Sequence, residues 1–242
     1  MRNLIIGCFL VFIFNQAWLQ VQGVQWHPDS AVKVSTLRDS VTKVITRFEK
    51  QIRQFEVADS NSFPPSGSFL FTGSSSIRGW KTLAADFSGY PVFGRGFGGA
   101  TFVELLHYFP RIVLKYKPSR IFIYCGENDM TLDYSIPEDV LISFKAFDSL
   151  CKIELPETRI YYISMKPCPK SWFYWPKIQI ANQLVKEYIA QDKTGRLQFI
   201  DVAFTLFDTM GKLDESLFLK DGIHINSTVY KKWADVIRPY LK

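Results

Sequence analysis

Short apolar runs alternate with helical patterns along the chain from Ser68 onward. The runs that predict β-strands are Phe69 to Thr72, Val92-Phe93, Arg120 to Cys125, Arg159 to Met165 and Gln198 to Val202. Between and after them, apolar residues three or four positions apart predict helices over Thr101 to Tyr116, Pro137 to Cys151, about Pro176 to Gln191 and about Ser227 to Tyr240. This alternation predicts an α/β protein with a parallel sheet and helices on both faces.

Two of the expected strands are almost entirely hydrophobic. Ile121-Phe-Ile-Tyr124 and Ile160-Tyr-Tyr-Ile163 fit strands that are buried on both faces. Sheets of this kind bind ligands beyond the carboxyl ends of their strands. Ser75, the glycines around Gly96, Asn128 and His224 all follow expected strands or precede expected helices. We therefore expect them to gather at one edge of the sheet.

Residues 1–23 have the pattern of an export signal. Arg2 is followed by an apolar run of eleven residues, Leu4 to Phe14, and Val21-Gln-Gly23 fits a cleavage site. The run is shorter than the roughly 20 apolar residues that span a bilayer. Ile5-Ile-Gly-Cys8 resembles a lipobox, but Cys8 lies inside the apolar run, which disfavours a lipoprotein. The pattern predicts an exported protein, periplasmic or secreted.

The segment between the signal and the first strand predicts a helix and a loop. Ala31 to Val57 has amphipathic spacing, and Asn61 to Gly67, rich in Ser and Pro, ends the pattern. We therefore divide the chain into a signal (1–23), an N-terminal helix and loop (24–65) and one main domain (66–242). We find no internal repeat.

Composition narrows the class of protein. Hydrophobic residues make up 47% of the 242, enough for a core that needs no disulfide framework. The net charge of +6 comes from scattered lysines and arginines, which argues against nucleic acid as a partner. After the signal only three cysteines remain, so at least one is unpaired. We expect Cys125 to be a buried thiol, and Cys151 and Cys168 to be able to pair.

A candidate nucleophile and a candidate base follow from residue types and positions. Ser75 lies in Gly73-Ser-Ser-Ser76, where a tight turn from strand to helix would expose a hydroxyl, although such a sequence also suits a simple helix cap. The histidines are His27, His107 and His224, and a serine hydrolase at neutral pH needs one as its base. His107 fits a helix face, whereas His224 follows Asp221 by three residues in a glycine-containing loop. There a carboxylate can orient the imidazole.

Four stretches resemble, in the same N-to-C order, the blocks of the SGNH (GDSL-like) hydrolases from about Ser66 to the end. They are Phe71-Thr-Gly-Ser-Ser-Ser-Ile77, Gly96-Phe-Gly-Gly99, Gly126-Glu-Asn-Asp129 and Phe218-Leu-Lys-Asp-Gly-Ile-His-Ile-Asn226. The resemblance implies Ser75 as nucleophile, with Ser74 replacing the family's aspartate, and Asp221 and His224 as its partners. It also implies an oxyanion hole made by Ser75, Gly99 and Asn128. The implied fold is a flavodoxin-like three-layer α/β/α sandwich with a five-stranded parallel sheet.

The activity that the resemblance implies is hydrolysis of a carboxylic ester. We expect short acyl, acetyl-like esters of a glycan, lipid or small alcohol, with no cofactor and no metal. Two alternatives stay open: an O-acyltransferase acting on an extracytoplasmic glycan, and a non-catalytic carbohydrate-binding relative.

Three other sequence features have competing interpretations. Gly94-Arg-Gly-Phe-Gly-Gly99 also matches a dinucleotide-binding pattern, with Glu127 as its possible acid, but that leaves Ser75 and His224 unexplained. The aromatics of Trp172-Phe-Tyr-Trp175 fit either a wall against an acyl or sugar group or the buried start of the next helix. Asn226-Ser-Thr is a glycosylation sequon, and we expect Asn226 instead to cap the last helix.

Overall fold

The computed structural model describes residues 46–242 of the chain. The expected signal (1–23) and the first part of the expected N-terminal helix lie outside the described residues. Phe48–Lys242 forms one compact unit, and its elements are described below.

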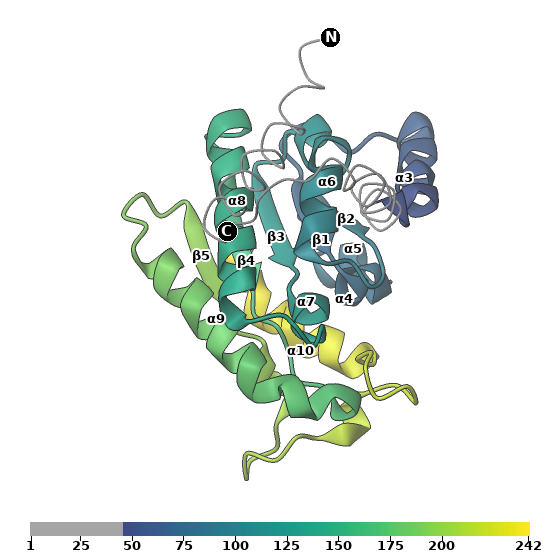
Figure 1. Cartoon of the computed structure of the whole chain (residues 1–242). Helices are drawn as coiled ribbons and strands as arrows, with labels where there is room; N and C mark the ends of the chain where they lie inside the picture. The colour runs from purple at the N-terminus through teal and green to yellow at the C-terminus, as the bar shows by residue number, and fades with distance from the viewer. Residues whose placement is uncertain (1–45) are drawn as a thin grey trace, which may run out of the picture. The chain divides into compact units, whose positions relative to one another are not determined.

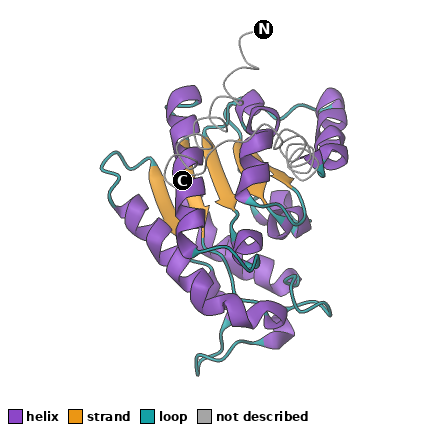
Figure 2. Ribbon diagram, in the orientation of Figure 1, coloured by secondary structure: helices purple, strands orange, loops and turns teal. Residues whose placement is uncertain are grey.

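A five-stranded, entirely parallel sheet forms the centre of this unit (Figure 2). The strand order is β2-β1-β3-β4-β5, the flavodoxin-like order. The bounds are Phe69–Gly73 for β1, Val92–Gly96 for β2, Arg120–Tyr124 for β3, Arg159–Ile163 for β4 and Leu197–Ile200 for β5. All five strands expected from the sequence are present, and the α/β fold is confirmed.

Helices cover both faces of the sheet (Figure 1). One face carries α6 (Phe102–Ile112), α8 (Pro137–Glu154) and α9 (Trp175–Ala190), with α3 (Glu49–Asn61) beside α6. The opposite face carries the short α4 (Ser75–Gly79) and α5 (Leu83–Asp86) and the final α10 (Ser227–Ile237). The three layers therefore match the expected sandwich.

Alternation along the strands divides the core into two halves. Leu70, Ile121 and Ile160 face the side of α6, α8 and α9. Their neighbours Phe71, Phe122 and Tyr161 face the side of α10 and stack across three strands, with adjacent ring centroids 4.5 Å apart. Each such ring buries a large apolar area, so both faces of the sheet contribute to stability.

Two helices end earlier than their apolar patterns predict. The chain leaves α6 at Ile112, just after Pro110, and continues as a 3₁₀ turn over Leu114–Tyr116. Likewise α10 ends at Ile237 and a 3₁₀ turn over Arg238–Leu241 follows. Pro239 lacks an N–H and crowds the preceding turn, which accounts for the end of α10. The end of α6 coincides with Val113, whose φ of −126° is not helical. In the opposite direction, α3 continues to Asn61 instead of ending at Val57.

Ion pairs hold α3 against the main body. Arg111 of α6 binds Glu49 and Glu56 of α3, each at 2.7 Å. Near the end of α3, Asp59 accepts from Arg95 of β2 and from the Tyr116 hydroxyl. The helix is therefore attached to an edge strand as well as to a neighbouring helix.

The three cysteines of the described residues are free and buried. Cys151 lies in the core half beside α8, and Cys168 lies in the half on the other side of the sheet. The sheet separates them, so the pairing that the sequence left open does not occur. No helix within residues 46–242 has both the length and the apolar character needed to cross a bilayer.

Candidate active site

The turn that carries Ser75 depends on a glycine. Gly73 ends β1 with a φ of +121°, and a Cβ there would lie 1.9 Å from the backbone oxygen of Tyr124 in β3. Only glycine accommodates both conditions. The next residue, Ser74, donates its N–H to that same oxygen at 2.9 Å. The chain then enters α4 at once, with Ser75 as its first residue.

The three consecutive serines differ in accessibility. Ser74 and Ser76 are buried, at 2% and 3% exposure, whereas Ser75 is partly exposed. The Ser76 carbonyl accepts a hydrogen bond from the Tyr230 hydroxyl of α10 at 2.9 Å, which fastens α4 to the last helix. Ser75 is therefore the serine of this turn that a substrate can reach.

Strand register places Ser75, Gly99 and Asn128 at the same edge of the sheet. Gly73 of β1 is paired with Gly96 of β2 on one side and with Tyr124 of β3 on the other. Ser75, Gly99 and Asn128 follow these three paired residues by only two to four positions. All three thus lie at the carboxyl ends of adjacent strands, the edge where sheets of this type bind ligands.

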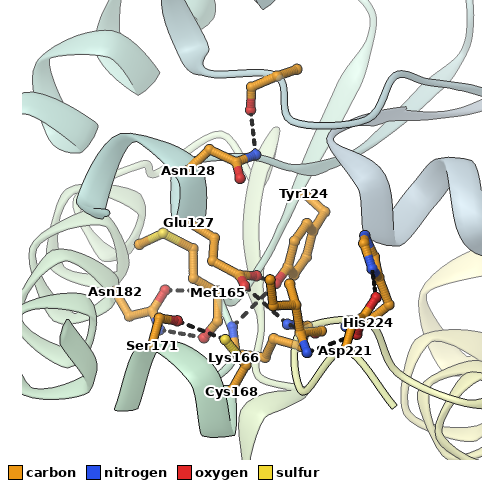
Figure 3. Close-up of polar contacts among 12 residues, drawn as sticks. Tyr124, Glu127, Asn128, Met165, Lys166, Cys168, Ser171, Asn182, Asp221 and His224 are labelled. Carbon is orange, nitrogen blue, oxygen red and sulfur yellow. Dashed lines mark hydrogen bonds and ion pairs between the residues drawn. The ribbon is translucent and has the colours of Figure 1, made fainter. Parts of the chain in front are cut away.

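Two hydrogen bonds connect the Asn128 turn to the loop that contains Gly99. Asn128 lies in the short helix α7 (Glu127–Met130), and its Nδ2 donates to the Ala100 carbonyl at 2.8 Å (Figure 3). The Asp129 carboxylate accepts the Phe102 N–H at the start of α6 at 3.0 Å. The first bond uses one amide hydrogen of Asn128 and fixes the orientation of the amide. Burial raises the pKa of Asp129 to about 6.

Asp221 and His224 form a hydrogen-bonded couple on the loop before α10. Their Oδ2 and Nδ1 atoms are 2.6 Å apart, and the other ring nitrogen of His224 is turned away from Asp221 (Figure 3). The second carboxylate oxygen accepts the backbone N–H groups of Ile223 and His224, each at 2.9 Å. These bonds hold the pKa of Asp221 well below its usual range, the largest effect coming from the imidazole. The couple is open to solvent, with side-chain exposures of 44% and 35%.

A buried polar network lies beneath this loop, and the sequence patterns did not predict it. Lys166, which follows β4, places Nζ 2.9 Å from Glu127 Oε1 and 2.8 Å from the Ile223 carbonyl. Tyr124 donates its hydroxyl to the other oxygen of Glu127. The sequence held one indication of this network, a lysine directly after an apolar strand. Lysine is rarely buried without a partner, so a lysine at such a position indicates a buried polar contact.

A model of the GDSL-like lipase/acylhydrolase family matches residues 39–237. The chain belongs to this family. It is accordingly a carboxylic ester hydrolase. The family predicted from the four sequence blocks is confirmed.

Solved structures share the fold of this GDSL-like acylhydrolase. A protein from Streptococcus pneumoniae, provisionally identified as a platelet activating factor, has a TM-score of 0.69 at 21% identity and covers 88% of this chain and 99% of its own. A GDSL-like lipase from Bacteroides thetaiotaomicron has a TM-score of 0.64 at 20% identity, covering 78% and 96%. A mutant of an acetyl-xylooligosaccharide esterase from Geobacillus has a TM-score of 0.57 at 14% identity, covering 74% and 95%. No curated protein sequence matches the chain.

The acylhydrolase does not use its glycine cluster as a dinucleotide-binding turn. Gly94 and Gly96 lie inside β2, an edge strand, and the next helix begins only at Phe102. A Cβ on Gly96 would lie 2.6 Å from the Ile77 Cβ of α4, so this glycine is needed for close packing. Glu127, the acid of that alternative, is paired with Lys166.

The structure also shows the surroundings of His107 and of the Ser75 hydroxyl. His107 lies on the exposed side of α6, in keeping with a helix-face role. Partial desolvation by its neighbours and the charge of Arg111 lower its pKa. Among residues 46–242 no hydrogen bond joins the Ser75 hydroxyl to His224. Catalytic hydrogen bonds of this kind often tighten only when substrate binds.

No group of three or more His, Cys, Asp or Glu side chains in this part of the chain is arranged to hold a metal ion.

The aromatic segment after β4 has one of its two expected roles, the buried start of the next helix. Trp175 is buried at the start of α9, whereas Trp172 and Phe173 are exposed at 46% and 88%. The segment is attached to the Asp221–His224 loop, because the Lys170 N–H donates to the Gly222 carbonyl at 3.1 Å. In the last helix, Asn226 accepts from the N–H groups at the start of α10, so its predicted capping role is confirmed.

Proposed function

We propose that the protein hydrolyses short acyl esters through a triad of Ser75, His224 and Asp221. The observation that carries the proposal is the Asp221–His224 couple, whose loop is bonded through the Ile223 carbonyl to Lys166, just beyond the carboxyl end of β4. A histidine oriented by a carboxylate, with its other nitrogen turned outward, has the arrangement of a general base.

Acylation of the serine is the first half of the reaction. The Ser75 hydroxyl oxygen attacks the ester carbonyl carbon while Nε2 of His224 takes its proton. The resulting oxyanion receives hydrogen bonds from the backbone N–H groups of Ser75 and Gly99 and from the Asn128 amide. His224 then gives the proton to the departing alcohol as the carbon–oxygen bond breaks, which leaves an acyl-serine.

Water completes the cycle. His224 takes a proton from a water molecule, whose oxygen attacks the acyl carbon and forms a second oxyanion in the same pocket. Collapse of this intermediate breaks the bond to Ser75, and the proton returns to the serine oxygen. Throughout, Asp221 accepts a hydrogen bond from the Nδ1–H group of His224 and stabilises the imidazolium. Each oxyanion donor in such a site contributes about 3 kcal/mol to the transition state.

For the substrate we propose an acetyl or similarly short ester of an extracytoplasmic glycan. The exposure of Asp221 and His224 suits a small acyl group on a large alcohol. The exposed Trp172 and Phe173 next to the His224 loop suit contact with a sugar ring. The expected export signal lies outside the described residues, and we propose that the protein acts outside the cytoplasm on the strength of that sequence pattern.

The test is hydrolysis of p-nitrophenyl esters of increasing chain length by the wild type and by Ser75→Ala, His224→Ala and Asn128→Ala. We expect the first two variants to lose about four to six orders of magnitude in kcat. Asn128→Ala should lose about 10²- to 10³-fold, because one oxyanion donor is gone. Ser74→Ala and His107→Ala are the matched controls and should keep wild-type rates. Full activity in Ser75→Ala would show that Ser75 is not the nucleophile.

The same proteins decide between hydrolysis and its two alternatives. An acyltransferase would acylate an added oligosaccharide faster than it releases free acid from the donor. A binding protein would retain a glycan equally well as wild type and as Ser75→Ala, with no turnover in either.

A further inference from the structure

Lys166 is one of the most buried charged residues among those the structure describes. Its side chain is 1% exposed and lies just beyond the carboxyl end of β4. The backbone before it is held firmly, because the Asn182 amide exchanges two hydrogen bonds with Met165, at 2.9 and 2.8 Å. The Lys166 N–H itself donates to the Tyr124 hydroxyl at 3.3 Å. These hydrogen bonds fix the backbone from which the Lys166 side chain extends, and so they help to fix the position of its ammonium group.

Stability alone does not explain a lysine at this place. A buried ion pair loses hydration on both partners, and apolar residues of similar size are often as stabilising or more so. The surroundings would accept such residues, since Tyr124, Met165 and Phe218 are all buried there. What an apolar side chain cannot do is donate a directed hydrogen bond to a backbone carbonyl.

That carbonyl belongs to the peptide unit that leads into the proposed base. The Ile223 oxygen accepts from Lys166 Nζ at 2.8 Å, and the N–H of the same unit, on His224, donates to Asp221 at 2.9 Å. A peptide unit held at both ends has a fixed plane. The direction in which His224 leaves the backbone is fixed with it.

The other partner of Lys166 leads to the proposed oxyanion hole. Glu127 binds Nζ at 2.9 Å and is directly followed in α7 by Asn128. One ammonium group thus joins the turn that carries the Asn128 amide to the loop that carries the imidazole (Figure 3). These segments are far apart in the sequence and come from different parts of the sheet edge.

We propose that Lys166 is a positioning residue that sets the orientation of His224 relative to Asn128 through the Ile223 carbonyl. The inference rests on the proposed function, since it gives His224 and Asn128 their roles. Lys166 itself touches neither the substrate nor the reacting atoms.

The kinetic arm of the test uses Lys166→Met and the double variant Lys166→Met/Glu127→Gln. The single change leaves the Glu127 carboxylate buried without its cation, which endangers folding. The double change removes that charge and still deprives the Ile223 carbonyl of its donor. We expect both variants to lose about 100-fold in kcat for p-nitrophenyl acetate with KM little changed, as displaced catalytic groups do. The control is Arg196→Met, which breaks a buried ion pair with Asp148 before β5, at the opposite edge of the sheet.

A second arm reads the geometry without catalysis. Proton NMR detects the Nδ1 proton that His224 shares with Asp221, and a His224→Ala sample assigns it. We expect this resonance to broaden or disappear in the double variant and to persist in Arg196→Met. If the wild type hydrolyses no ester, the proposed function fails, while this arm still tests the role of Lys166 in orienting His224.

The outcomes separate cleanly. The positioning role is supported if the double variant loses both kcat and the Nδ1 resonance while Arg196→Met keeps both. Wild-type kcat in the double variant would overturn it. So would a folded double variant whose Nδ1 resonance is unchanged, whatever its activity.

Discussion

Asp129, which accepts the N–H at the start of α6, should make stability fall as pH rises through weakly acidic values. Burial raises its pKa from 3.8 to about 6, helped by the nearby Glu104 and Asp139, despite the hydrogen bond from Phe102. Because the folded protein holds this proton more tightly than the unfolded chain, the contribution is present below about pH 4 and is lost by about pH 6. A shift of about two units corresponds to about 3 kcal/mol.

The assay is urea denaturation at several pH values between 4 and 8 for the wild type and Asp129→Asn. The asparagine keeps an oxygen that can accept the Phe102 N–H but cannot ionise. Carboxylates common to both proteins cancel in the difference. Relative to the variant, the wild type should lose about 2 to 3 kcal/mol of unfolding free energy over this range. Asp235→Asn, at an exposed position of α10, serves as the control. Parallel pH dependence of wild type and Asp129→Asn would refute the reasoning.

Gly73→Ala should lower the free energy of unfolding by about 3 kcal/mol or more, because the new methyl group meets the Tyr124 backbone. Gly195→Ala is the control: this glycine also has a positive φ but lies in open space, so the variant should lose only about 1 kcal/mol. Urea denaturation measures both, and equal losses would contradict the steric argument. Phe173→Ala should raise KM for an acetylated oligosaccharide about fivefold and leave p-nitrophenyl acetate hydrolysis unchanged, since one aromatic contact with the sugar is lost. Ile153→Ala, an exposed residue of α8, is its control, and an unchanged KM in Phe173→Ala would exclude the sugar contact.

Local hydrophobic patterns were sufficient for the sheet because its strands contain short apolar runs, and long helices separate β3, β4 and β5. Ile121 to Tyr124 and Ile160 to Ile163 are buried on both faces, and their runs leave no competing interpretation. The same approach missed α4, α5 and α7, which are too short for a helical period to show. It also extended α6 beyond Ile112 to Tyr116, since apolar spacing continues into the 3₁₀ turn that follows the helix.

The candidate site, like the fold, contains a part that the sequence predicted and a part that it did not. Motifs singled out Ser75, Asn128 and His224 as candidates, because the residue types proposed for acyl transfer lie in recognisable local sequences. The network around Lys166 has no such sequence signal. Its partners, Glu127 and the Ile223 carbonyl, are 39 and 57 positions away, and one of them is a backbone atom. Only the folded sheet brings these groups within hydrogen-bonding distance.

The anchor of the His224 loop is a backbone oxygen, and this has a consequence for how the protein can change in evolution. Every amino acid supplies that oxygen, so the half-buried side chain at position 223 can be replaced without loss of the bond from Lys166. Positions 166 and 127, by contrast, depend on each other's charge. Substitutions in a lineage of related enzymes would then be correlated between 166 and 127 and uncorrelated between 166 and 223. The bond from Lys166 to the Ile223 carbonyl would leave no record of its own in the covariation of sequences.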